Sequence, residues 1–123
     1  MTSKKVGNTV ASNPLQTVDY KYNIRGWLTD INDVEQAIRP KLFSFNINYG
    51  SHFNGNISGV SWKTNEQDSY KTYRFDYDGL NRLLTADFAV IQTGFIGGST
   101  NVGAYNEYVK GYDYNGNIKG FTR

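Results

Sequence analysis

A seven-residue pattern occurs three times in this chain and constrains its fold more than any other feature. Each copy has a tyrosine, an Asp or Asn after it, a Gly or Asn three residues later, and a closing Leu or Ile. The copies are residues 22–28 (YNIRGWL), 77–83 (YDGLNRL) and 112–118 (YDYNGNI). A fourth stretch, residues 51–57 (SHFNGNI), keeps the turn and the closing aliphatic residue but has lost the tyrosine and the acidic residue. Such repetition is typical of folds assembled from one supersecondary unit.

Each copy has the residues of a hairpin tip. A type I turn favours Asp or Asn at its first position, where the side chain bonds to the backbone two residues further on. The fourth position needs a left-handed backbone, which Gly adopts freely and Asn tolerates better than most residues. The first positions are Asn23, Asp78 and Asp113, and the fourth positions are Gly26, Asn81 and Gly116. The pattern therefore predicts three tips with positive φ at the fourth position.

The residues on either side of each turn are expected to lie on paired strands. They are Tyr22 and Leu28, Tyr77 and Leu83, and Tyr112 and Ile118. An aromatic residue opposite an aliphatic one on neighbouring strands contributes roughly 0.2–1 kcal/mol. We therefore interpret the motif as a folding unit.

Alternation of apolar and polar residues predicts further strands. Residues 41–49 place Phe43, Phe45, Ile47 and Tyr49 on one face, and residues 73–77 and 84–88 alternate in the same way on either side of a tip. The content of 15% aromatic residues and 13 glycines also favours strands and turns. The spacing of Val34, Ala37 and Ile38 after Asn32 and Asp33 predicts about two helical turns that are capped by Asn32 or Asp33 and end before Pro40. We predict a mainly all-β fold, an antiparallel sheet of consecutive hairpins with one short helix.

Composition excludes several function classes. A net charge of +2 gives no basic stripe for nucleic acid, and the absence of cysteine excludes disulfides and thiolate chemistry. No apolar run is long enough to span a membrane, and the first fifteen residues lack the apolar core of a signal peptide. The single histidine, His52, occupies a turn position, and no pair of carboxylates stands out as catalytic. The sequence predicts no enzyme, no cofactor and no metal site.

The motif resembles the YD repeats of Rhs proteins, bacterial wall-associated toxins, insecticidal toxin complexes and animal teneurins, whose signature is Y-D-x-x-G-R-L. Tyr77, Asp78, Arg82 and Leu83 match it most closely, whereas Trp27 and Asn117 replace its Arg. The longer strings at residues 18–33 (VDYKYNIRGWLTDIND) and 75–88 (FDYDGLNRLLTADF), and the NGNI segment with Trp62 after it, are similar to Rhs-repeat proteins of Bacteroidetes. The resemblance covers most of the chain from Val18 onward.

This resemblance implies a spiral β-sheet with one hairpin per repeat, which winds into a shell around other segments. We therefore expect a lead-in, partly flexible, at residues 1–17 and a repeat segment at 18–123. The implied function is structural, and the implied location is the cell surface or the medium, with the export signal upstream. Nothing in the chain resembles the self-cleaving core or a toxin domain of complete Rhs proteins, so neither activity is expected.

Two alternatives to this function stay open. Trp27 and Trp62, with the many tyrosines, are candidates for stacking on sugar rings in a carbohydrate-binding or adhesion module, although aromatic residues more often fill cores. A few repeats also present unpaired strand edges and an uncovered apolar face, which predicts either neighbouring repeats of a larger chain or self-association. A small self-associating β-protein is therefore the second alternative.

Overall fold

The computed structural model describes residues 2–7, 14–34, 41–64, 69–92, 99–100 and 102–123. Within these ranges the chain forms ten strands and no helix. The strands are β1 (Ser3–Val6), β2 (Gln16–Tyr22), β3 (Leu28–Ile31), β4 (Phe43–Asn48), β5 (Gly59–Thr64), β6 (Ser69–Tyr77), β7 (Leu83–Gln92), β8 (Ser99–Thr100), β9 (Glu107–Tyr112) and β10 (Ile118–Thr122).

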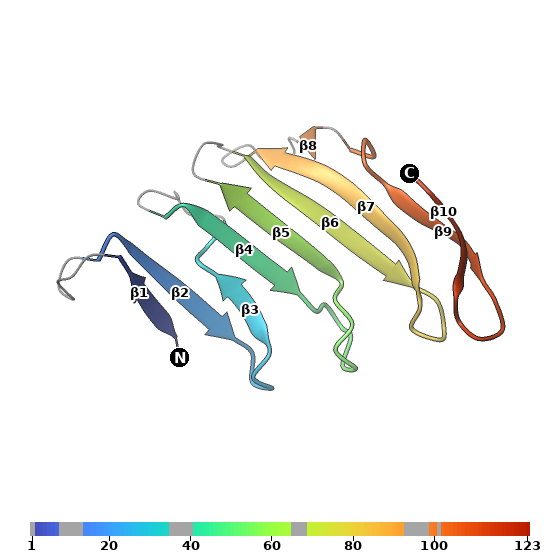
Figure 1. The fold of residues 1–123 in the computed structure, drawn as a ribbon, viewed down its shortest axis with the longest axis horizontal. Coiled ribbons are helices and arrows are strands. Elements are labelled where there is room, and N and C mark those ends of the chain that lie inside the picture. The colour runs from blue at the N-terminus through green and yellow to red at the C-terminus, as the bar shows by residue number, and fades with distance from the viewer. Residues whose placement is uncertain (1, 8–13, 35–40, 65–68, 93–98, 101) are drawn as a thin grey trace.

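The strands form one antiparallel sheet whose order follows the chain. The path runs β1-β2-β3-β4-β5-β6-β7-β9-β10, and the two-residue β8 pairs with β7 beside this path. Figure 1 shows the strands laid side by side from the N-terminus to the C-terminus in a single twisted layer. The predicted all-β antiparallel sheet is confirmed, and the strands expected at residues 41–49, 73–77 and 84–88 are present as β4, β6 and β7.

The four hairpin tips lie along one edge of the sheet. They connect β2 to β3, β4 to β5, β6 to β7 and β9 to β10, and all four point to the lower edge in Figure 1. This common direction follows from the topology, because every second connection between antiparallel neighbours returns to the same side. The copies of the motif therefore lie in a row along this edge of the sheet.

The predicted helix lies almost wholly outside the described residues, because residues 35–40 are not among them. Asn32, expected as a possible helix cap, has a φ of 55° and is buried. Its Oδ1 accepts a hydrogen bond from the Asp19 N–H at 3.0 Å, and its Nδ2 donates to the Phe43 carbonyl oxygen at 2.6 Å. In the structure Asn32 joins β2 to β4 at the point where β3 ends.

Strand β1 lies inside the segment 1–17 that the sequence suggested as a lead-in. It pairs with β2 from Ser3 opposite Asp19 to Val6 opposite Gln16, and all four of its residues are exposed. Residues 3–6 show no alternation strong enough to predict this strand.

The sheet has one aromatic face and one polar face. Phe45 pairs with Trp62, and Tyr73 pairs with Phe88, so these rings lie on the same face. On the other face Ser61 Oγ donates to Thr72 Oγ1 at 3.1 Å. A hollow of about 480 Å³ on this side is lined by amides, hydroxyls and charged groups together with apolar residues such as Ala89, Ile91 and Val102.

Candidate functional site: the row of hairpin tips

The three full copies of the motif form turns with the same backbone geometry. In each turn the N–H of the fourth residue donates to the carbonyl oxygen of the first, at 2.9 Å for Gly26, 2.9 Å for Asn81 and 3.1 Å for Gly116. Their φ angles are 78°, 61° and 85°, so the positive φ predicted for this position is confirmed. A Cβ added at Gly116 meets no atom within 4 Å, so the turn needs glycine for its backbone conformation and not for space.

The flanking tyrosine and aliphatic residue of each copy pair across the hairpin, as predicted. The register partners are Tyr22 with Leu28, Tyr77 with Leu83, and Tyr112 with Ile118. In every case a register shift adjoins this pair, which is how a hairpin accommodates a left-handed residue after a type I turn. Tyr22 and Ile118, in the first and last tips, are about half exposed, at 46% and 55%.

The side chain at the first turn position closes each turn in the same way. Its Oδ1 accepts from the backbone N–H groups two and four residues further on. For Asp78 these donors are Leu80 and Arg82, both at 2.9 Å, and for Asp113 they are Asn115 at 2.9 Å and Asn117 at 2.8 Å. Asn23 accepts in the same pattern from Arg25 at 2.9 Å and Trp27 at 3.0 Å. This shared pattern explains why Asp and Asn are interchangeable at this position.

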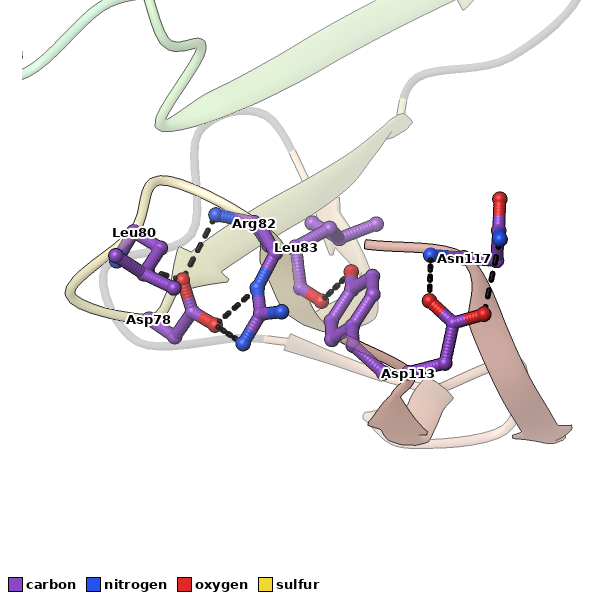
Figure 2. Close-up of polar contacts among 7 residues, drawn as sticks. Asp78, Leu80, Arg82, Leu83, Asp113 and Asn117 are labelled. Atoms are coloured by element: carbon purple, nitrogen blue, oxygen red, sulfur yellow. Dashed lines mark hydrogen bonds and ion pairs between the residues drawn. The ribbon is translucent and has the colours of Figure 1, made fainter. Parts of the chain in front are cut away.

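The second carboxylate oxygen explains the preference for a donor at the sixth position of the motif. Asp78 Oδ2 accepts from Arg82 Nε at 2.7 Å and forms an ion pair with Arg82 Nη2 at 2.7 Å, whereas Asp113 Oδ2 accepts from Asn117 Nδ2 at 2.9 Å (Figure 2). The hydrogen bond from the Arg82 N–H lowers the pKa of Asp78, and the guanidinium adds to this effect. The amide of Asn117 lowers the pKa of Asp113. Both carboxylates are therefore held in their charged form by their own turn.

Each tip is also joined to the tip before it by a tyrosine hydroxyl. Tyr77 donates to the carbonyl oxygen of Ile57 at 2.8 Å, and Tyr112 donates to that of Leu83. Ile57 and Leu83 are the closing aliphatic residues of the preceding copies. The tyrosine of one motif therefore binds the last residue of the motif before it, and we call these contacts the tyrosine ladder.

The degenerate fourth copy keeps its place in the tyrosine ladder through a residue that the motif did not identify. Tyr49, two residues before this copy, donates to the carbonyl oxygen of Leu28 at 3.0 Å, and its ring lies 5.1 Å from that of Trp27. The His52 N–H then donates to the Tyr49 carbonyl oxygen at 3.0 Å, and Gly55 takes a φ of 93°. The sequence signal was present, since Tyr49 ends the alternating run 41–49 just before this copy.

Two arginines add further contacts between neighbouring tips. The Arg82 guanidinium, paired with Asp78 in its own turn, lies 4.3 Å from the centre of the Tyr112 ring in the next tip. Arg25 lies over the Phe53 ring of the following tip at 5.6 Å and donates to the Phe53 carbonyl oxygen. Sequence reasoning identified Arg82 only as a motif residue and missed its role between tips.

Amide side chains join the second tip to the third. Asn54 Nδ2 and Asn56 Nδ2 both donate to Asn81 Oδ1, at 2.9 and 3.3 Å. Asn81 is also the left-handed residue of its own turn. An asparagine there supplies an acceptor that a glycine lacks.

The two tryptophans do not form a common platform. Trp27 is half-buried within the first tip, with the Arg25 guanidinium 5.2 Å from its ring centre. Trp62 is half-buried on β5, where its ring stacks with that of Tyr73 at 6.0 Å and lies 6.4 Å from that of Phe88. The structure thus places them in separate clusters.

Polar side chains of the tips form hydrogen bonds with neighbouring tips. The described ranges hold no group of three or more His, Cys, Asp or Glu side chains that could bind a metal ion, and no helix there could cross a membrane. The arrangement is therefore suited to joining hairpins.

No family model, curated protein or solved structure matches the chain.

Proposed function

We propose that this chain is a non-enzymatic structural repeat segment of a secreted or surface YD-repeat protein, forming part of a β-shell that encloses or displays other segments. The observation that carries the proposal is the tyrosine ladder, in which Tyr49, Tyr77 and Tyr112 each bind the closing residue of the preceding tip. Three successive contacts of one kind are what a wall made of repeated units needs.

Each contact of the tyrosine ladder joins one tip to the tip before it, and this supports a sheet that is extended by adding hairpins. Every contact of the ladder joins nearest neighbours, so a further hairpin meets the same surface as the last one did. Repeat proteins gain stability in this way, as a sum of unit and neighbour terms. A larger sheet requires no new kind of contact.

The two edges of the sheet support the same proposal. In the described part of the sheet, β1 and β10 each have a strand on one side only. Four of the five residues of β10 are exposed, and Gly120 is half-buried. Open backbone groups on such edges bind further strands readily. We propose neighbouring repeats as the partners of these edges.

The test is the mass and location of the native product. An antibody raised against these 123 residues is used on cells and culture medium, with protease treatment of intact cells. A band far above 13.9 kDa that is released into the medium or removed by the protease agrees with a wall segment. A band near 13.9 kDa, or a protected band inside the cells, contradicts the proposal.

A further inference from the structure

The aromatic face of the sheet carries two groups of rings that meet where Phe45 pairs with Trp62. We define this cluster by Phe43, Phe45, Trp62, Tyr73, Phe75 and Phe88. Successive rings lie 5.2 to 6.4 Å apart, from Trp62 across Tyr73 to Phe75 and Phe88. Phe43 stacks with Phe45 at 6.3 Å on the neighbouring strand. The cluster therefore spans β4 to β7.

In the described structure the segment 102–106 covers part of this face, where the Tyr105 ring lies edge-on against Phe88 at 5.2 Å, and no second layer of described residues covers the rest. Among the described residues, only Val34, Ala86 and Phe88 are buried apolar side chains. Most rings of the face are half-buried, and Phe43 is 41% exposed. A sheet with one apolar face is normally covered by a second layer of structure, because its own strands shield only the flanks of each ring.

The accessible surface of the chain shows how far this single-layer sheet departs from a compact monomer. The chain exposes 8566 Å², whereas a compact monomer of 13.9 kDa exposes about 6,700 Å². The excess is roughly 1,900 Å² per chain. This excess is spread over both faces, the edges and the tips; if about half of it lies on the aromatic face, two copies bury on the order of 1,900 Å² in total, which is the size of a stable interface.

We propose that the isolated chain dimerises face to face, with the aromatic face of a second copy as the missing layer. The two sheets form a sandwich with their strands roughly aligned and their rings interdigitated, as the twist of two like sheets allows. A two-fold axis makes the face its own partner, so Trp62 and Tyr73 of each copy meet the same cluster in the other. The inference concerns the isolated chain and does not depend on the proposed function.

The first experiment measures the mass of the chain by analytical ultracentrifugation over a range of concentrations. We expect a dimer of about twice 13.9 kDa that dissociates on dilution. Phe43→Lys places a charge in the interface at an already exposed position and is expected to weaken dimerisation by about tenfold or more. Leu80→Lys is the matched control, because it removes an apolar residue that is 73% exposed at a tip with the same change in charge.

A second measurement does not depend on a variant of the face. In a Trp27→Phe background, Trp62 is the single tryptophan and reports on the aromatic face. Its emission is expected to shift to longer wavelength as the dimer is diluted, because the ring becomes hydrated. Circular dichroism at each concentration shows whether the sheet remains folded or unfolds as the dimer dissociates, and either result agrees with a shared core.

Three outcomes overturn the inference. One is a folded monomer at every concentration. Another is a dimer that dissociates without any change in Trp62 emission, which indicates pairing through strand edges. The third is a dimer weakened by Leu80→Lys and not by Phe43→Lys, which indicates contact through the tips.

Discussion

The hydroxyl of Tyr77 donates a hydrogen bond to the carbonyl oxygen of Ile57 at 2.8 Å, across the boundary between two hairpins. Tyr77 precedes one turn, and Ile57 closes the turn before it. The ring of His52 in that earlier tip packs edge-on against Tyr77 at 5.7 Å. A residue that recurs in each full copy of a local motif thus acts between repeats.

Replacing Tyr77 by Phe removes this hydrogen bond and keeps the ring. We expect Tyr77→Phe to lower the free energy of unfolding by about 0.5–1.5 kcal/mol, the usual net value of one such bond. Tyr114→Phe is the control, because Tyr114 is fully exposed at the last tip. Urea unfolding of both variants measures the effect, and equal stability of the two would contradict the tyrosine ladder.

The same hydroxyl gives an expectation at high pH. Burial raises the pKa of Tyr77 above its ordinary value of 10.0, and ionisation removes the proton that the bond to Ile57 needs. A raised pKa in the folded state means that this stability is fully present below pH 10 and is lost as the pH rises through the folded pKa. The stability difference between the parent chain and Tyr77→Phe should shrink over this range, as urea unfolding from pH 8 upward measures.

We expect Gly116 to stabilise its tip because glycine adopts a left-handed backbone conformation without strain. Gly116 has a φ of 85°, and an added Cβ there meets nothing within 4 Å. Gly116→Ala should destabilise the chain by about 1–2 kcal/mol, the cost of a left-handed residue with a side chain. Gly79→Ala is the control, since an added Cβ there also meets nothing and its φ is not positive. Thermal unfolding compares the two, and equal losses would refute the turn assignment.

Acid should weaken the third tip through Asp78. The hydrogen bond from the Arg82 N–H, followed by the Arg82 side chain, lowers the pKa of Asp78 below 3.8. A lowered pKa gives stability that is present above pH 3.8 and is lost as the pH falls through the folded pKa. Asp78→Asn keeps the Oδ1 acceptor but lacks the charge, so its stability should fall less steeply in acid.

The control for this prediction is Asp76→Asn, which lies on β6 two residues before Asp78. Asp76 is exposed, and its Oδ2 lies 3.5 Å from Thr85 Oγ1. Because Asp76 accepts one long hydrogen bond and no bond of the turn, urea unfolding between pH 2 and 6 is expected to show a larger change of acid slope for Asp78→Asn than for Asp76→Asn. A parent-like slope for Asp78→Asn would show that the pair with Arg82 does not contribute.

The turns were predictable from sequence because their bonds are local. Asp78 and Asp113 bind backbone groups within four residues, and Gly116 needs only its own φ, so a seven-residue pattern contains the whole cause. The alternation around Phe45 likewise identified a strand. These are short-range effects that propensity describes well.

The contacts between tips were not predictable in the same way. The approach of Arg82 to Tyr112 depends on the register between two hairpins, which no single motif specifies. The motif does not identify Tyr49, because this residue stands outside the aligned copy. The local pattern predicts Asn32 or Asp33 as a helix cap, because the partners that Asn32 binds lie thirteen and eleven residues away. The local periodicity of a sequence does not indicate which distant residues a polar side chain will bind.

The agreement between strand order and chain order has a consequence for how this sheet is made and changed. Each hairpin pairs with the hairpin that precedes it in the chain, so it can fold onto that hairpin during synthesis before later residues are made. For the same reason, a gene that gains or loses the codons of one hairpin lengthens or shortens the sheet and leaves the order of the other strands unchanged. Duplication of a single hairpin would thus add one complete structural unit to the sheet.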